Sequence, residues 1–246
     1  MKTSLQINNP LFTADSLSVG YESNLLITDI SFELFAGDLV LLCGPNGIGK
    51  STLLKTVAGL IKPISGQCGT VSPDVRVSFV PSRIPKVAGF TVSEFVALSC
   101  HQDSDWLGRL PDKFYERINE ALDTLGIGHL ADRDIDSLSD GEFQKSCIAV
   151  AVVREADIVL LDEPTAFLDV DSRAEVMQGL SSLSDAGMAV MFSSHDIHDA
   201  VRYADRVMGL KKENGAVRFT DSGRGASKES ILSVVSSCFN VIANIL

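Results

Sequence analysis

The chain has 246 residues, of which 45% are hydrophobic and 22% charged, as in a soluble globular protein with a full core. Its formal net charge of −11 argues against a protein that acts alone on nucleic acid or anionic lipid, because both favour basic surfaces. A bilayer-spanning helix needs roughly 20 apolar residues. The longest apolar run, Cys147 to Val153, is far shorter and ends at Arg154.

The start of the chain and its cysteines indicate the compartment. The first residues lack the basic start and apolar block of a signal peptide, so we expect no export. The five cysteines, at positions 43, 68, 100, 147 and 238, show no metal-ligand spacing. An odd number of cysteines without a signal peptide favours reduced thiols in a cytosol, where most would be small core residues.

Apolar segments alternate with helical patterns in two blocks, from about residue 5 to 80 and from about 157 to 210. Such alternation predicts an α/β fold with a largely parallel sheet covered on both faces. Helical patterns at 170–184 and 196–203 separate the last three strands. The expected strands are 31–35, 39–43, 75–80, 158–161, 189–193 and 206–210.

The first block contains a complete GxxxxGK[ST] sequence between the expected strand 39–43 and an expected helix at 53–60. Its glycines let backbone N–H groups turn toward a phosphate, and the helix N-terminus adds positive potential. Lys50 can reach the β- and γ-phosphates, and the Ser51 hydroxyl can bind Mg²⁺. A plain glycine-rich turn is the alternative, and the full spacing with both flanks favours a nucleoside triphosphate site. The expected nucleotide-binding residues are Gly44, Pro45, Asn46, Gly47, Gly49, Lys50, Ser51 and Thr52.

Residues 90–148 carry no convincing strand pattern. Helical patterns cover Thr91–Ser99 and Lys113–Leu125, and a stronger one covers Phe143–Arg154. Pro111 and Asp112 mark the start of the second helix, and Gly126 marks its end. The simplest interpretation is a helical insertion in an α/β core.

Two acidic residues follow the expected strand 158–161. A carboxylate at this strand end would lie near the phosphate loop, where Asp162 can hold Mg²⁺ through water. The adjacent Glu163 suits a general base that polarises an attacking water. Solvated or capping acids are the alternative, and the complete phosphate loop favours the catalytic interpretation.

The segment Leu138–Glu142 precedes the helical pattern of Phe143–Arg154. Ser139 is a good N-cap, with Glu142 three residues later as in a capping box. A helix N-terminus with a serine hydroxyl and a glycine can also bind a γ-phosphate. The spacing alone does not decide between these two roles.

The final segment, 227–246, has apolar residues at helical spacing and no basic face. We expect a C-terminal helix that packs on its own core; contact with a partner or a membrane edge is the alternative. The apolar residues are Ile231, Val234, Val235, Cys238, Val241, Ile242 and Ile245.

Together these motifs resemble the ATP-binding cassette subunit of an ABC transporter over about residues 15–215. Residues 44–52 match the Walker A loop, residues 158–163 match Walker B, and residues 138–142 resemble the LSGGQ signature. The resemblance implies a P-loop NTPase (RecA-like) core with a largely parallel sheet, an N-terminal antiparallel β portion and an inserted all-helical subdomain. The implied divisions are 1–88 with 149–220 for the core, 89–148 for the helical subdomain and 221–246 for a helical tail.

The same resemblance implies individual roles, with ATP and Mg²⁺ as cofactors. Tyr21 occupies the place of the aromatic residue that stacks on adenine. Ser139 and Gly141 would touch the γ-phosphate, and Asp169 lies in the loop that follows Walker B. His195 stands where the family has its switch histidine, whereas a lone histidine after a strand is otherwise a capping or surface group. The implied catalytic residues are Glu163 and His195, and the implied metal ligands are Ser51 and Asp162.

Two departures from the family pattern bear on activity. Ser82 follows Val80–Pro81 where the family has glutamine, and its shorter side chain would need a bridging water to reach Mg²⁺. Asp140 and Glu142 replace glycine and glutamine in the signature. A carboxylate beside a triphosphate repels it unless it points away. We expect hydrolysis, with a weakly hydrolysing regulatory cassette as one alternative.

Residues 91–98 and 106–110 resemble cassettes of importers for iron–siderophore complexes, haem and cobalamin. The family resemblance implies a head-to-tail homodimer, with each ATP between the phosphate loop of one copy and the signature of the other. It further implies separate multi-span permease subunits, a solute-binding protein, a peripheral place on the cytoplasmic face of the membrane, and no nucleic acid. Dimer closure would act on the permease through a groove near residues 82–94. A soluble ATPase of a non-transport assembly, such as an iron–sulfur scaffold, is the second alternative.

Overall fold

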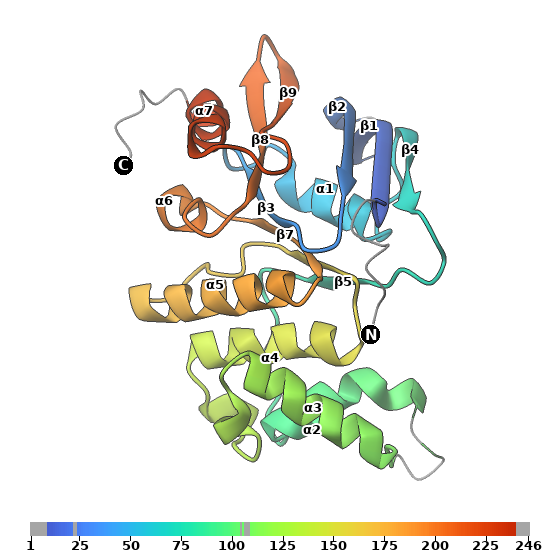
Figure 1. The fold of residues 1–246 in the computed structure, drawn as a ribbon, viewed down its shortest axis with the longest axis vertical. Helices are drawn as coiled ribbons and strands as arrows, with labels where there is room; N and C mark the ends of the chain where they lie inside the picture. Colours follow the sequence, from blue (N-terminus) through green and yellow to red (C-terminus); the bar gives the residue numbers. More distant parts are fainter. Residues whose placement is uncertain (1–8, 22–23, 104, 106–108, 240–246) are drawn as a thin grey trace.

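The computed structural model describes residues 9–21, 24–103, 105 and 109–239. A six-stranded sheet forms its centre, in the order β5-β6-β7-β3-β8-β9 (Figure 1). The first five of these strands are parallel, and β9 pairs antiparallel with β8. The strands are β3 (Leu39–Cys43), β5 (Val77–Val80), β6 (Ile158–Leu161), β7 (Ala189–Ser193), β8 (Arg206–Glu213) and β9 (Ala216–Asp221).

A smaller antiparallel sheet covers one side of the central sheet, in the order β2-β1-β4. It is the antiparallel β portion that the family resemblance implies. Helix α1 (Lys50–Val57) lies between the two sheets, and its apolar side chains pack into the core that they share (Figure 1). The strands are β1 (Phe12–Tyr21), β2 (Asn24–Leu34) and β4 (Ser65–Thr70).

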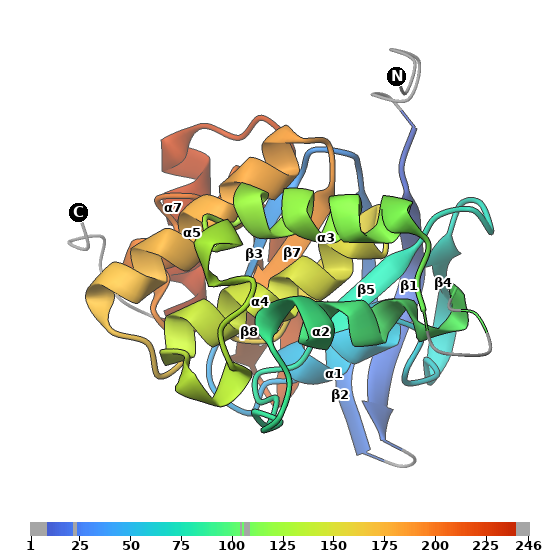
Figure 2. The same ribbon diagram turned by 90° about the horizontal axis from the view of Figure 1, so that it is seen from below.

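The other face of the central sheet is covered by helices (Figure 2). α4 contacts α2, α3, α5 and β5, which explains why its sequence is apolar on nearly every side. The helices beyond α1 are α2 (Val92–Ala97), α3 (Asp112–Thr124), α4 (Asp140–Val153), α5 (Val170–Asp185), α6 (Ile197–Ala200) and α7 (Lys228–Phe239). Short 3₁₀ segments cover Leu98–Asp103, Gly128–Leu130 and Ile135–Ser137. Within the described part of the chain, we find no helix with both the length and the apolar character to cross a membrane.

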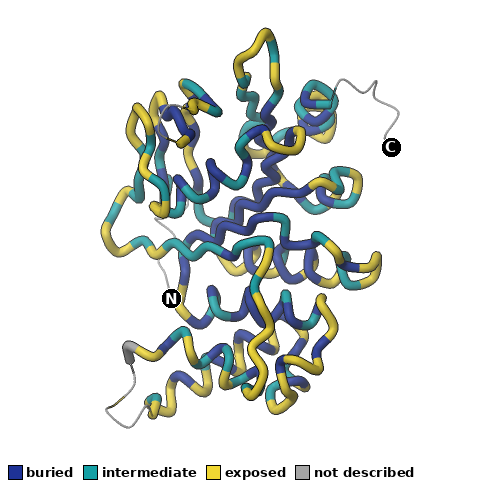
Figure 3. The backbone as a smooth tube through the Cα atoms, turned by 180° about the vertical axis from the view of Figure 1, so that it is seen from behind, coloured by how far each residue is buried: buried dark blue, intermediate teal, exposed yellow. Residues whose placement is uncertain are grey.

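Strand β3 shows why the central strands read as unbroken apolar runs. All five of its residues are buried, and they alternate between the two cores. Leu39, Leu41 and Cys43 face the helices, whereas Val40 and Leu42 face α1 and the smaller sheet. A strand buried on both faces needs apolar residues at every position. Figure 3 shows the same concentration of buried residues along the middle of the molecule.

The predicted strands 39–43, 158–161 and 189–193 are confirmed with their bounds. The predicted strand 31–35 is the end of the longer β2, which ends at Leu34. The predicted helix 53–60 is wrong at both ends, because α1 begins at Lys50 and ends at Val57. Gly59 then turns the chain with a φ of 73°, which an L-residue rarely adopts.

The predicted helix 196–203 is also shorter than expected. α6 spans only Ile197–Ala200, and turns follow it. The backbone N–H of Asp205 already donates to Leu39 in β3, so the chain must return to the sheet. Residues 106–108 and 240–246, which include Val241, Ile242 and Ile245, lie outside the described residues.

The described part of the C-terminal helix packs on the core, as predicted. Ile231, Val235 and Cys238 of α7 are buried, and α7 lies against β8 (Figure 1). The Cys238 Sγ lies 3.8 Å from the Sγ of Cys43, the last residue of β3. A hydrogen bond to Cys238 and burial raise the pKa of the Cys43 thiol, so it stays protonated.

Gly209 permits this close packing of α7. A Cβ at this position would lie 2.4 Å from the Cys238 Sγ and 2.8 Å from a Val234 methyl carbon. We expect Gly209→Ala to lower the free energy of unfolding by about 1–3 kcal/mol, because overpacking moves α7 from the sheet. Urea unfolding measures the change. Gly69→Ala is the matched control, since a Cβ there meets nothing within 4 Å, and an equal loss in both variants would contradict the packing argument.

Candidate nucleotide-binding site

The phosphate loop connects β3 to α1 and is built around its own lysine. Lys50 Nζ donates to the carbonyl oxygens of Gly44 at 2.7 Å and of Pro45 at 3.3 Å. Gly44 has a φ of 151°, and a Cβ there would lie 2.5 Å from the Leu210 carbonyl oxygen. Lys50 is buried, and burial lowers its pKa, although Glu163 and Asp162 oppose the shift. The loop therefore holds a partly desolvated cation at a helix N-terminus, where anions bind.

Asp162 lies beside this loop, as the sequence predicted. Its Oδ1 accepts a hydrogen bond from the Ser51 hydroxyl at 2.9 Å and another from the Ser193 hydroxyl at 2.9 Å. The carboxylate is buried at the end of β6. A hydroxyl and a carboxylate oxygen at this distance are a donor pair that suits Mg²⁺.

Ser193 is a site residue that the sequence did not single out. Besides binding Asp162, its oxygen accepts the backbone N–H of Glu163 at 3.0 Å. It is fully buried at the end of β7, the neighbour of β6. The available signal was its place at the end of a strand parallel to the one that carries the acids.

Glu163 and His195 form a contact between Oε2 and Nε2. Glu163 has a φ of 54°, a strained value for a non-glycine residue, which is typical of functional positions. His195 follows β7, so two neighbouring strands bring the pair together. The arrangement places an acid–base pair at the mouth of the phosphate loop.

Lys50, Ser51, Glu163 and His195 share one cavity of about 270 Å³, which is open to solvent. Tyr21 lies at its edge, 49% exposed, and its hydroxyl accepts a hydrogen bond from Thr52 at 3.5 Å. Of the described residues, none from 138–142 lines the cavity. The lining residues are Leu26, Asn46, Gly47, Gly49, Lys50, Ser51, Thr52, Glu163 and His195.

The segment 138–142 forms the predicted capping box of α4. The Ser139 hydroxyl accepts the Glu142 N–H at 3.2 Å, and the Glu142 carboxylate accepts the Ser139 N–H at 2.8 Å. The second bond is the main cause of a lowered pKa at Glu142. Gly141 permits close packing of α4 on α5, because a Cβ there would lie 2.7 Å from Ser172. Ser139 and Gly141 therefore have structural roles in the cap and the packing of α4.

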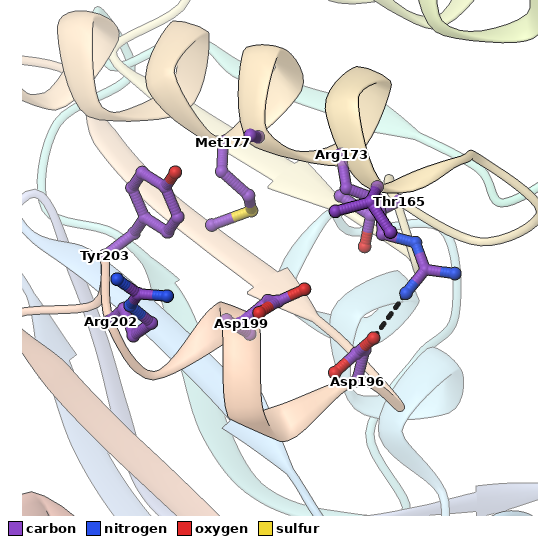
Figure 4. A pocket seen from close by; sticks show the side chains of 10 residues that line it. Thr165, Arg173, Met177, Asp196, Asp199, Arg202 and Tyr203 are labelled. Atoms are coloured by element: carbon purple, nitrogen blue, oxygen red, sulfur yellow. Dashed lines mark hydrogen bonds and ion pairs between the residues drawn. The ribbon is translucent and has the colours of Figure 1, made fainter. Parts of the chain in front are cut away.

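Asp169 and Arg173 organise the loop after β6. The Asp169 carboxylate accepts the Ser172 N–H at 2.8 Å and caps α5, which lowers its pKa. Arg173 Nε donates to the Leu168 carbonyl oxygen at 2.8 Å, and its Nη1 pairs with Asp196 (Figure 4). Arg173, another residue that the sequence did not single out, thus joins this loop to the loop of His195.

Ser82, where the family has glutamine, is half-buried just beyond the end of β5. The last β5 residue, Val80, accepts the backbone N–H of Asp162 at 2.9 Å. The segment that begins at Ser82 therefore starts close to the acidic pair.

The sequence profile of the ABC transporter family matches residues 27–166, more than half of the chain. The chain belongs to the ABC transporter family. This match includes the phosphate loop, the signature segment and the acidic pair. It confirms the resemblance that the motifs carry.

Curated relatives and solved structures agree with this assignment. The ABC transporter chain is 31% identical over 246 residues to the achromobactin transport ATP-binding protein of Dickeya dadantii, covering 95% of this chain and 89% of that protein. It is 31% identical over 207 residues to the zinc import ATP-binding protein of Hydrogenovibrio crunogenus, covering 83% and 80%. A metal-chelate type ABC transporter in an inward-facing conformation has a similar fold, with a TM-score of 0.80, 28% identity and coverage of 95% and 90%. The chain is therefore an ATP-binding ABC transporter subunit, and its ATPase activity serves transport.

We expect Ser193→Ala to damage this ABC ATPase site. The substitution leaves the Glu163 N–H without its partner and removes one hydrogen bond from Asp162, which costs about 1–3 kcal/mol of unfolding free energy. It should also slow steady-state ATP hydrolysis. Ser184→Ala is the control, because among the described residues this buried hydroxyl donates only to the Ser181 carbonyl oxygen, near the end of α5. Equal ATPase rates in the two variants would contradict the role of Ser193.

Proposed function

We propose that this chain hydrolyses Mg²⁺-bound ATP to drive import of a metal chelate, of the iron–siderophore class, through separate membrane subunits. The single observation that carries the catalytic part is the convergence of Ser51, Asp162, Glu163 and His195 beside Lys50. The substrate class is supported by relatives whose names include achromobactin, petrobactin and ferric enterobactin transport.

The donor set fits Mg²⁺ held jointly with ATP. Ser51 and Asp162 offer a hydroxyl and a carboxylate oxygen, which are ligands that a hard cation prefers. Across the described residues, no cluster of three His, Cys, Asp or Glu side chains could hold a metal without other ligands. Phosphate oxygens and water would complete the set, as is usual for this ion. When bound, the ion would neutralise charge on the phosphates.

The remaining residues position and activate the reactants. Lys50 would turn from the Gly44 and Pro45 carbonyls to the phosphate oxygens. Glu163 would accept a proton from the attacking water as its oxygen bonds to the γ-phosphorus and the bond to ADP breaks. His195, in contact with Glu163, would orient this carboxylate and contact the γ-phosphate. Tyr21, exposed at the edge of the cavity, would stack on adenine.

A second copy of the chain would complete the site. The cavity is open, and Ser139 and Gly141 belong to a helix N-terminus elsewhere in the chain. In a head-to-tail homodimer, each signature would close over the ATP of the other copy, and Asp169 would lie at the joint. The proposed divisions are 1–88 with 149–220, 89–148 and 221–246. The dimer would sit at the cytoplasmic face of the membrane on multi-span permease subunits, served by a solute-binding protein.

Glu163→Gln should keep ATP binding and slow hydrolysis by about 10²- to 10⁴-fold, because an amide cannot accept the proton. It should accumulate as an ATP-bound dimer, which sedimentation velocity with Mg²⁺ and ATP would detect. Lys50→Ala is the control, and it should stay monomeric because it lacks the ammonium group that would bind the phosphates. Turnover at the wild-type rate in folded Glu163→Gln would refute the assigned base.

The transport role can be tested by purifying the tagged chain from membranes and identifying its partners. We expect multi-span membrane chains, and in proteoliposomes we expect ATP-dependent uptake of a ferric siderophore. Free Zn²⁺ is the comparison solute, given the zinc import relatives. Partners that are all soluble would favour the non-transport assembly, and uptake of Zn²⁺ alone would overturn the chelate assignment.

A further inference from the structure

The signature segment, residues 138–142, carries a negative charge that pairs with a lysine of the same chain. Asp140 is the first residue of α4, between Ser139 and Gly141. Its Oδ1 lies 3.0 Å from the Lys86 Nζ, which comes from the connector between β5 and α2. The Asp140 side chain is 71% exposed, whereas that of Lys86 is only 29% exposed. The lysine is thus the more deeply seated partner.

Among the described residues, the three contacts of Lys86 Nζ all reach the same short segment. Besides Asp140, the ammonium group donates to the Leu138 carbonyl oxygen at 2.7 Å and lies 5.6 Å from the centre of the Phe143 ring. Phe143 is buried and packs on Phe95 of α2, with 5.7 Å between ring centres. Residues 138–143 therefore surround one cation with a carbonyl, a carboxylate and an aromatic face.

The second acid of the signature is engaged differently. The Glu142 carboxylate accepts the Ser139 N–H and lies 4.0 Å from Arg133. It is part of the helix cap and turned back on its own chain. Asp140 points to Lys86 instead, so the charge that would repel an incoming phosphate is balanced by one specific lysine.

The connector that carries Lys86 also contacts the loop after β6. The Arg83 guanidinium lies 5.1 Å from the centre of the Phe167 ring, just before Asp169. The connector begins beyond Val80, which bonds Asp162. It therefore runs from the ATP site of its own chain to the two segments that would face the ATP of a second copy.

We propose that Lys86 is a positioning residue for the signature, which neutralises Asp140 and fixes Leu138 so that Ser139 and Gly141 can receive a γ-phosphate. This inference rests on the proposed head-to-tail dimer. It accounts for how a signature with aspartate in place of glycine accepts ATP.

The test is a double-mutant cycle with Lys86→Met and Asp140→Gly. Methionine keeps an unbranched side chain of similar length and removes the charge. We expect Lys86→Met to raise the KM for ATP about tenfold with a smaller change in kcat, because an unbalanced carboxylate weakens binding of the phosphate. With Asp140→Gly already present, the same substitution should change KM less than twofold. Lys86→Arg keeps the positive charge, so its KM for ATP should stay close to that of wild type.

Lys113→Met is the matched control. Lys113 also lies over a phenylalanine, 5.3 Å from the centre of the Phe114 ring, but at the start of α3. It should leave the KM for ATP unchanged. Raising KCl from 50 to 300 mM should reduce the difference in the KM for ATP between Lys86→Met and wild type, since salt screens exposed charge.

A direct readout separates this proposal from the one on which it rests. In a Glu163→Gln background, the ATP concentration for half-maximal dimerisation is measured by sedimentation, with and without Lys86→Met. If the Glu163→Gln protein never dimerises, the proposed function fails. If it dimerises and Lys86→Met leaves that concentration unchanged, or if the shift persists with Asp140→Gly, only the role of Lys86 is overturned.

Discussion

Parallel pairing of β3, β6 and β7 is the constraint on which the rest of the site depends. Hydrogen bonding in register places the carboxyl ends of these strands side by side, with Leu161 opposite Phe192 and Leu42 opposite Ser193. The phosphate loop, the acidic pair and His195 each follow a strand at that edge of the sheet. Ser193, at the end of β7, then bonds both members of the acidic pair through one hydroxyl. A change in strand order would move these residues apart, and no local sequence motif could bring them back together.

Much of this arrangement was predictable because its signals are local. The strands 39–43, 158–161 and 189–193 are buried on both faces and therefore have continuous apolar sequences. Strands β4 and β9 were not recognised individually, since they are at best half-buried. β4, with sequence SGQCGT, has neither apolar alternation nor β-branched residues apart from one threonine. Its strand conformation comes from pairing with β1.

Tertiary contacts explain what the sequence could not reveal about the site. The links Lys86–Asp140, Arg173–Asp196 and Ser193–Asp162 join residues that are 54, 23 and 31 positions apart. No spacing rule predicts such pairs. The sequence showed that Asp140 would repel a triphosphate unless its side chain points away. In the structure this side chain points to Lys86. The sequence also left two roles open for Ser139, of which the structure shows the capping role.

The thiol pair at the end of β3 has a consequence for how this ATPase could be observed. Cys43 immediately precedes the phosphate loop, and Cys238 belongs to the helix packed behind it. Both thiols are buried, so a reagent reaches them only when α7 lifts from the sheet. Their labelling rate would report the free energy of that local opening, apart from global unfolding. A nucleotide that made the phosphate loop more rigid would slow the labelling of these two thiols. Their labelling rate would therefore also report nucleotide binding.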